Sequence, residues 1–404
     1  MQKILNEIIW RFEREANLTD ELAMDIIIKT FFEYPEAKEL SLKEQEQVIN
    51  KFFYKTRRKL GILQPLIENQ DVSEIMVNGP EKIFYEIDGR IEKYDMTFDS
   101  VEDLEEVMRN IASEVHREVN ELNPIVDARL KDGSRVNCVY KNVAINGPAL
   151  TIRKFSEKFI KMQDLVENET ISEEGKILLN TLVECGYNIF VSGGTSSGKT
   201  TLLNALAEAV PKEERVIVIE DSMELKLNYI DNIVHMECRN SNSQGRGSVT
   251  MDDLIKSSLR MRPNRIIVGE VRGKEVVSMI QAMNTGHQGS LSTGHGNSVR
   301  GMLRRLESMY LMGINLNIDA IRSQIAEAID IMVHVEKLDD GRRRVIEIDE
   351  LTDYKNGEFI LNPIMTMNQS GYLVATKNMI DNTRKLYLKG EKYVERLQKC
   401  NFIM

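Results

Sequence analysis

The chain has 404 residues, 42% of them apolar, with 53 Lys and Arg against 63 Asp and Glu. This length and apolar content are enough for two or three domains with hydrophobic cores, which excludes fully disordered and fibrous proteins. The formal net charge of −10 argues against a protein that mainly coats nucleic acid, because such proteins need a basic face. The 4 cysteines are widely separated, so the sequence contains neither a zinc knuckle nor a disulfide framework.

Targeting signals are not predicted. Acidic residues interrupt the apolar positions of the N-terminus (MQKILNEIIWRFERE). Nowhere do about 18 consecutive apolar residues occur, as a membrane-spanning helix would need. We therefore expect a cytoplasmic protein, and peripheral attachment to a membrane complex stays open.

Residues 1–60 are predicted to form a helical segment. Apolar residues recur at a spacing of three to four from Ile4 to Phe12, a second run follows the cap signal at Thr19, and a charged helix is expected from Ser41 to about Lys59. These helices either bind a partner near a membrane or cap the next domain.

Residues 61–155 are predicted to form an α+β domain, followed by a polar linker with a helix over 156–176. The expected elements are strands over 74–77 and 82–87 with a turn at Asp88-Gly89, a helix over 101–118, a hairpin over 129–140 and a strand over 149–154.

Residues 177–350 read as an α/β domain, because apolar strands alternate with amphipathic helices. This alternation is typical of a mostly parallel sheet covered by helices on both faces. The expected strands are 188–192, 216–220, 265–269, 290–293 and 331–335. A hairpin is expected at residues 339–341, and residues 351–404 are expected to be a C-terminal tail that ends in a basic helical stretch.

One motif dominates the chemistry, a GxxxxGK[ST] loop between the apolar strand at 188–192 and a helix that opens at Lys199. Its glycines let backbone N–H groups wrap a phosphate at the positive end of a helix. Lys199 would neutralise the β- and γ-phosphates, and the Thr200 hydroxyl would bind Mg²⁺. The motif predicts ATP binding by Gly193, Gly194, Thr195, Ser196, Ser197, Gly198, Lys199, Thr200 and Thr201.

Two acidic residues at strand ends are candidates for the metal and the attacking water. Glu220 closes the strand over 216–220, and Glu270 follows the strand over 265–268. Carboxylates at the carboxyl ends of parallel strands face the ligand crevice. We expect Glu270 to position or activate water and Glu220 to assist with Mg²⁺ or water, although either residue could instead cap a helix.

Two histidines lie close together in the sequence, His287 and His295. His295 follows a short apolar strand between glycines, so its ring could reach a γ-phosphate and respond to hydrolysis. A plain hydrogen-bonded role stays open, and a metal site is disfavoured because no third ligand follows at a suitable distance.

Arginines are the last set of candidates. Arg135 and Arg153 lie outside the phosphate-loop domain, and an arginine from another domain or subunit can stabilise charge in a phosphoryl-transfer transition state. Further candidates for phosphate contacts or subunit interfaces are Arg239, Arg246, Arg260, Arg262 and Arg272.

Four segments resemble the sequence boxes of the type II/type IV secretion ATPases. GGTSSGKTT (193–201) resembles the Walker A box, EDSMEL (220–225) the Asp box, LRMRPNRIIVGEVRG (259–273) the Walker B box, and 285–297 the His box. The form of the third segment is closest to the pilus-assembly branch of the tight-adherence (Flp/Tad) system. Two departures are the absence of a tetracysteine zinc insert and Gly296 where an alanine is common.

The resemblance implies a RecA-like ATPase domain preceded by a small α+β, PAS-like domain. It further implies a homohexamer at the cytoplasmic face of the membrane, which binds ATP and Mg²⁺ but no zinc, with Arg135 and Arg153 reaching the nucleotide. ATP hydrolysis would then drive pilin or protein export through an inner-membrane platform protein.

Other functions are considered beside this motor. One is a nucleotide-gated scaffold with little turnover, and another is a conjugation-type ATPase that transfers nucleic acid. The net charge and the lack of a basic aromatic stripe argue against the second. A small-molecule kinase is least favoured, because it would have no use for the GEVRG segment and the His box together.

Overall fold

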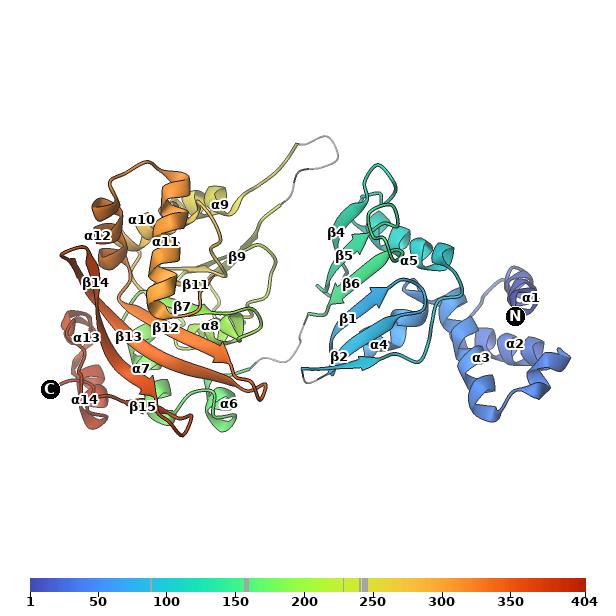
Figure 1. Cartoon of the computed structure of the whole chain (residues 1–404), viewed down its shortest axis with the longest axis horizontal. Helices are drawn as coiled ribbons and strands as arrows, with labels where there is room; N and C mark the ends of the chain where they lie inside the picture. The colour runs from blue at the N-terminus through green and yellow to red at the C-terminus, as the bar shows by residue number, and fades with distance from the viewer. Residues whose placement is uncertain (88, 156–159, 228, 240, 242–245) are drawn as a thin grey trace. The chain divides into compact units, whose positions relative to one another are not determined.

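The computed structural model describes residues 1–87, 89–155, 160–227, 229–239, 241 and 246–404. It divides into two compact units, Met1–Lys158 and Phe159–Met404 (Figure 1). Asp88 of the predicted turn lies outside the described residues. No helix within the described ranges is long and apolar enough to cross a membrane.

The first unit begins with the predicted helices. Thr19 and Ser41 cap α2 and α3 by accepting backbone N–H groups, as the sequence signals indicate. The helices share an apolar core of their own, and Lys55 of α3 pairs with Asp99, just before α5, and with Asp103 in the first turn of α5. The helices are α1 (Gln2–Phe12), α2 (Asp20–Phe32), α3 (Leu42–Arg57), α4 (Gln64–Glu68) and α5 (Val101–Glu114), with short 3-10 turns at Pro35–Glu39 and Gly61–Leu63.

A six-stranded antiparallel sheet completes the first unit, in the order β3-β2-β1-β6-β5-β4. α5 packs its buried apolar face, which includes Leu104 and Met108, into the same core as the sheet. The strands are β1 (Val72–Asn78), β2 (Ile83–Ile87), β3 (Arg90–Lys93), β4 (Ile125–Arg129), β5 (Arg135–Val139) and β6 (Ala149–Arg153).

The second unit is built on a nine-stranded sheet in the order β15-β14-β13-β12-β7-β11-β10-β8-β9. The six strands from β12 to β9 in this order are parallel, and the other three are antiparallel. The strands are β7 (Ile189–Gly193), β8 (Val216–Glu220), β9 (Ile233–Glu237), β10 (Arg265–Val268), β11 (Leu291–His295), β12 (Ile331–Lys337), β13 (Arg343–Lys355), β14 (Glu358–Met367) and β15 (Leu373–Ala375).

Helices cover both faces of this sheet (Figure 1). Successive strand residues face opposite sides, so Ile189 and Val191 join the core under α7 and α8 while Phe190 joins the core under α10 and α11. The helices are α6 (Met162–Glu167), α7 (Glu173–Glu184), α8 (Lys199–Ala207), α9 (Met251–Ser258), α10 (Val276–Asn284), α11 (Val299–Gly313), α12 (Ile318–Ala328), α13 (Arg384–Lys389) and α14 (Glu391–Lys399). This architecture is the predicted α/β fold with a mostly parallel sheet.

Residues 351–404 do not form the separate tail that the sequence predicted, but are part of the second unit. β13 crosses residue 350, β14 and β15 extend the sheet, and the chain then packs α14 beside α7. Part of the expected linker over 156–176 likewise belongs to the second unit, because it forms α6 and the start of α7.

Candidate active site

The phosphate loop joins β7 to α8 at the carboxyl edge of the sheet. Gly198 stands at the N-cap of α8 with φ 96°, a left-handed conformation that favours glycine. A Cβ on Gly193 would overlap the carbonyl oxygen of Val335 on β12 and the hydroxyl of Ser197. The structure therefore has the strand, loop and helix that the motif requires, and glycine is needed at both positions.

Lys199 lies over this loop. Its side chain is only 6% exposed, and its Nζ donates to the carbonyl of Gly194 at 2.7 Å. The same Nζ lies 3.3 Å from Nδ1 of His295 at the end of β11. β11 runs parallel to β7 with His295 opposite Gly193, which brings the histidine beside the phosphate loop.

Glu270 completes this group from the end of β10. Its Oε1 lies 2.9 Å from Nε2 of His295, without the alignment of a hydrogen bond, and that oxygen is buried. Arg272 donates to the other carboxylate oxygen at 2.9 Å and approaches Asp221 at 3.4 Å. The two residues predicted at the water and γ-phosphate positions are thus side by side, and Arg272 fixes one of them.

The electrostatics favour a neutral imidazole. Burial lowers the pKa of His295 below its ordinary value, and the nearby cations Lys199 and Arg272 act in the same direction against the opposing carboxylate of Glu270. The hydrogen bond to Glu270 raises the pKa of Arg272. His295 can therefore accept a proton or a hydrogen bond at neutral pH.

Glu220 forms hydrogen bonds with the backbone that follows its own strand. Its Oε1 accepts the backbone N–H groups of Glu224 at 2.9 Å and Leu225 at 3.1 Å, which holds the chain that follows β8. A Cβ on Gly269 would lie 3.0 Å from Cγ of Glu220, so the Gly-Glu pair at the end of β10 leaves room for this buried carboxylate. Its predicted part in Mg²⁺ binding stays a prediction.

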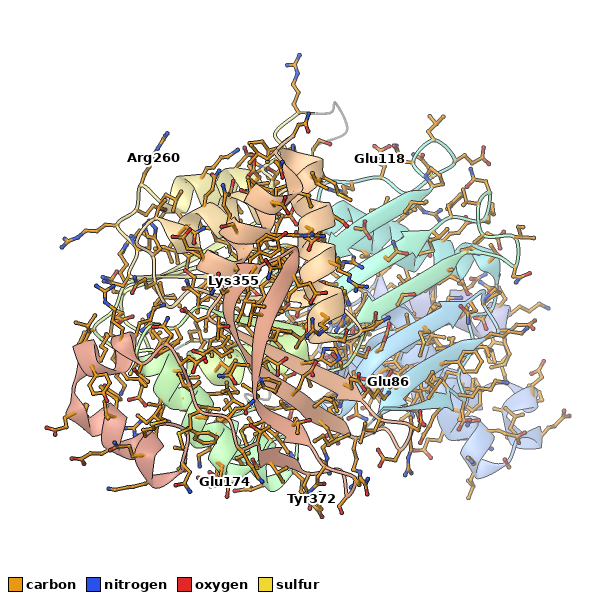
Figure 2. The ribbon with its side chains drawn as sticks, turned by 60° about the vertical axis from the view of Figure 1, so that its left-hand side comes forward. Glu86, Glu118, Glu174, Arg260, Lys355 and Tyr372 are labelled. Atoms are coloured by element: carbon orange, nitrogen blue, oxygen red, sulfur yellow. The ribbon has the colours of Figure 1, made fainter. Side chains whose placement is uncertain are left out.

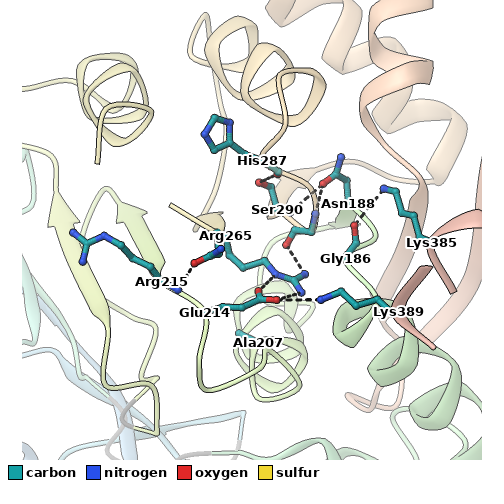
Figure 3. Close-up of polar contacts among 12 residues, drawn as sticks. Gly186, Asn188, Ala207, Glu214, Arg215, Arg265, His287, Ser290, Lys385 and Lys389 are labelled. Atoms are coloured by element: carbon teal, nitrogen blue, oxygen red, sulfur yellow. Dashed lines mark hydrogen bonds and ion pairs between the residues drawn. The ribbon is translucent and has the colours of Figure 1, made fainter. Parts of the chain in front are cut away.

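His287 does not join the site. It precedes β11, at the amino edge of the sheet, where its backbone carbonyl accepts from Ser290 at 2.8 Å (Figure 3). The two histidines, which are close in the sequence, therefore lie at opposite edges of the sheet.

The position after His295 is occupied by a glycine for a local steric reason. A Cβ on Gly296 would lie 3.0 Å from Cβ of Met302.

The predicted arginines of the first unit lie on one sheet. Arg135 on β5 is directly opposite Arg153 on β6, and Arg129 on β4 is opposite Arg135. Directly opposite residues lie on the same face of a sheet, so the three arginines form one row across β4, β5 and β6. Sequence reasoning missed Arg129, although Arg129 and Arg135 flank the same predicted hairpin. The role of these arginines at the phosphate loop stays a prediction.

Among the other candidate arginines, Arg260 and Arg262 are exposed. Figure 2 shows Arg260 at the margin of the second unit, with its side chain directed away from neighbouring elements.

Comparisons with known proteins bear on the family and the fold of the chain. The sequence model of the family described as "Type II/IV secretion system protein" matches residues 56–397. An uncharacterized protein of Methanocaldococcus jannaschii is 41% identical over 256 residues, which are 60% of this chain and 34% of that protein. The chain therefore spans about a third of the length of that relative.

Two further similarities cover more of the other protein. The conjugal transfer protein TrbB of Rhizobium radiobacter is 32% identical over 298 residues, which are 72% of this chain and 88% of TrbB. A crystal structure of the pilus retraction motor PilT with bound ADP covers 84% of this chain and 89% of PilT, with a TM-score of 0.54 and 21% identity. At this level of identity, the similarity to PilT concerns the fold alone.

Proposed function

Because the chain belongs to the type II/IV secretion system protein family, we propose that it is a Mg²⁺-dependent ATPase that drives a secretion or pilus-assembly system. The observation that carries the proposal is the contact of His295 with both Lys199 of the phosphate loop and Glu270 of β10. Three side chains from three neighbouring segments meet there, and we propose that the γ-phosphate and its attacking water bind beside them.

The loop suits the phosphates of ATP. Lys199 supplies a buried positive charge, and a Cβ on Gly194 would meet no atom within 4 Å, so the backbone is open to a ligand there. Thr200, half-buried in the first turn of α8, and Glu220 would hold Mg²⁺, which usually takes one or two protein ligands beside substrate phosphates. When bound, Mg²⁺ would neutralise negative charge on the phosphates.

Each side chain has a distinct proposed role. Glu270 orients and activates water, since its buried Oε1 receives no aligned hydrogen bond from the described residues. Arg272 holds the Glu270 carboxylate, and neutral His295 responds to the γ-phosphate. Arg135 and Arg153 supply positive charge from the first unit, as the resemblance to the family implies.

The motor role extends the proposal to partners. We propose a homohexamer at the cytoplasmic face of the membrane that works on an inner-membrane platform protein, and the Flp/Tad branch remains the favoured assignment. The similarity to TrbB, which is named a conjugal transfer protein, favours nucleic-acid transfer as the second candidate. The net charge of −10 argues against direct work on nucleic acid.

The test is Mg²⁺-dependent ATP hydrolysis by the purified chain, with its mass measured by light scattering. Glu270→Gln should lower kcat by about 10²–10⁴-fold, the range for loss of a general base, while ADP binding persists. Glu174→Gln is the matched control, because Glu174 is exposed on α7 and is also changed by one charge (Figure 2).

Three outcomes distinguish the candidates. A hexamer that loses turnover only in the Glu270 variant supports the motor. ADP binding without turnover in the wild type supports a nucleotide-gated scaffold. Strong stimulation by single-stranded DNA supports nucleic-acid transfer.

A further inference from the structure

The β12–β13 hairpin lies against the phosphate loop. Val335 of β12 is the strand partner of Gly193, and its carbonyl oxygen occupies the space that a side chain on Gly193 would need. The hairpin then turns at residues 338–341 and returns as β13, which begins at Arg343. No sequence box marks this hairpin, so its contacts with the loop come from the structure alone.

Arg343 touches the middle of the loop. Its Nε donates to the carbonyl of Ser196 at 3.1 Å, and its Cδ would lie 3.1 Å from a Cβ on Gly198. Within the described residues, the terminal nitrogens of Arg343 make no hydrogen bond or ion pair. The aliphatic part of the side chain therefore packs on one glycine of the loop while the guanidinium holds a carbonyl two residues earlier.

The residue that Arg343 holds has an unusual backbone conformation. Ser196 has φ 58°, in the left-handed region that non-glycine residues seldom adopt. In a trans peptide the carbonyl and the following N–H point in opposite directions. A Ser196 carbonyl directed at Arg343 therefore leaves the N–H of Ser197 directed away from Arg343.

The next arginine anchors the hairpin on its other side. Arg344 is 4% exposed, and it donates to the carbonyl of Asn168 at 2.8 Å and to the carboxylate of Glu169 at 2.7 Å. Neighbouring strand residues face opposite sides, so β13 can hold the turn after α6 with Arg344 and the loop with Arg343. The buried anchor gives Arg343 a fixed base.

We propose that Arg343 is a positioning residue of the nucleotide site, which holds the Ser196–Ser197 peptide so that the N–H of Ser197 faces a bound phosphate. This inference rests on the proposed function, since it assigns part of the same site. Arg343 acts through the loop and takes no part in the reaction itself. Its removal weakens phosphate binding in the ground state and in the transition state equally, because the loop holds the phosphates in both.

Calorimetric titration with two probes, Mg²⁺-ADP and Mg²⁺-pyrophosphate, tests the proposal without turnover. Arg343→Ala should raise the Kd for both probes about tenfold, the size expected for one hydrogen bond from a charged group. The KM for ATP should rise by a similar factor with kcat changed less than about twofold. Arg343→Lys, which keeps a donor on a more flexible chain, should recover part of the affinity.

Arg342→Ala is the matched control. Arg342 precedes Arg343 on the same hairpin and carries the same charge, but it pairs with Asp340 at 2.6 Å and contacts no loop residue in the described structure. Its substitution should leave both Kd values unchanged, and melting temperatures without ligand should agree among all variants within about 2 °C.

Several results would overturn the proposal. Equal weakening by Arg342→Ala would mean a general charge effect, and weakening for ADP alone would mean a contact with the base or ribose. A fall in kcat at unchanged KM would mean direct contact with the reacting phosphate. A wild type that binds both probes without hydrolysing ATP would refute the proposed ATPase and still test Arg343, whereas absence of binding would refute both.

Discussion

The two edges of the nine-stranded sheet differ in how completely their polar side chains are hydrogen-bonded. At the amino edge, Asn188 accepts the N–H group of Ser290 at 3.0 Å (Figure 3). It also accepts the N–H group of Gly289 at 2.8 Å and donates to the carbonyl of Ala328 at 2.6 Å. Arg265 is 1% exposed and is paired with Glu214 and the carbonyl of Gly289. The polar groups of these side chains are therefore hydrogen-bonded or ion-paired within the protein.

At the carboxyl edge, Glu270 and His295 keep capacity for a ligand. A buried oxygen of Glu270 receives no aligned hydrogen bond from the described residues, and burial lowers the pKa of His295, which lies between Lys199 and Glu270. Incomplete bonding of a buried carboxylate is unfavourable for folding, so it is expected where a ligand completes the bonding. The comparison predicts that changes at the amino edge alter stability and changes at the carboxyl edge alter turnover.

The largest effect on stability is expected at Arg265. Arg265→Met leaves the Glu214 carboxylate without its buried partner and the Gly289 carbonyl without a donor, which should lower the free energy of unfolding by about 3–5 kcal/mol. Chemical denaturation followed by circular dichroism measures this change. Arg260→Met, at an exposed arginine, is the matched control and should change stability by less than about 0.5 kcal/mol. Lost ADP affinity at unchanged stability would contradict the comparison.

Asp349 on β13 is an exception to the saturated bonding near the amino edge. The neighbouring Glu350 accepts the N–H groups of Asp381 and Asn382, both at 2.8 Å, whereas Oδ1 of the 4% exposed Asp349 has no hydrogen-bond partner in the described structure. Burial, with a smaller contribution from Glu347, raises the pKa of Asp349 to about 7. The folded protein therefore binds this proton more tightly than the unfolded chain does.

This shift predicts a pH dependence of stability. The stabilising contribution of the protonated carboxyl is complete below the unfolded pKa of about 4 and is lost as the pH rises through about 7, by up to about 4 kcal/mol in total. Asp349→Asn should remove this loss and be more stable than the wild type at pH 8. Chemical denaturation from pH 4 to pH 8 measures how the free energy of unfolding of the wild type and of Asp349→Asn changes with pH. The same pH dependence in both proteins would show that the pKa of Asp349 is not raised.

At the carboxyl edge, His295→Ala should lower kcat about 10–100-fold, within or just below the range for proton-transfer groups, because it removes the link between Lys199 and Glu270. The melting temperature should stay within about 2 °C. Since burial lowers the pKa of His295, the wild-type rate should lose its histidine-dependent part only below pH 6.5, as the ring becomes charged. The measurement is kcat of the wild type and of His295→Ala from pH 5 to pH 8. If kcat of the variant fell at low pH in the same way as that of the wild type, the result would contradict this role of His295.

Sequence reasoning succeeded where one local signal was strong. The predicted strand over 216–220 has the same bounds as β8. Its sequence is four apolar residues followed by Glu220, all of them buried, and such a continuous apolar run is typical of a parallel strand that is covered on both faces. The phosphate loop was predicted because its motif is contiguous. Its meeting with Glu270 and His295 follows from parallel strands whose carboxyl ends share one edge.

The expected tail failed for the opposite reason. β13 carries charged residues even at buried positions such as Asp349 and Glu350, and most of β14 is exposed or half-buried, so neither strand has a continuous apolar run. Their turn nevertheless has a signal, since Asn356 and Gly357 both have positive φ and Asn-Gly is typical of a tight hairpin. Arg343 had no such signal, because its contact joins two residues 147 positions apart. Contacts of that range follow from sheet order, which local patterns do not encode.

The smallest effect is expected where the amino edge meets solvent. Lys389 of α13 approaches Glu214 at 3.4 Å, but its side chain is 43% exposed, whereas Lys385 on the same helix pairs with Asp330 at 2.6 Å and is 15% exposed. Lys389→Met should therefore lower the free energy of unfolding by less than about 1 kcal/mol, and the difference should vanish in 1 M NaCl because salt screens exposed pairs. Lys385→Met should keep most of its larger effect at high salt. If the two variants responded alike to salt, burial would not be what distinguishes the polar contacts at this edge.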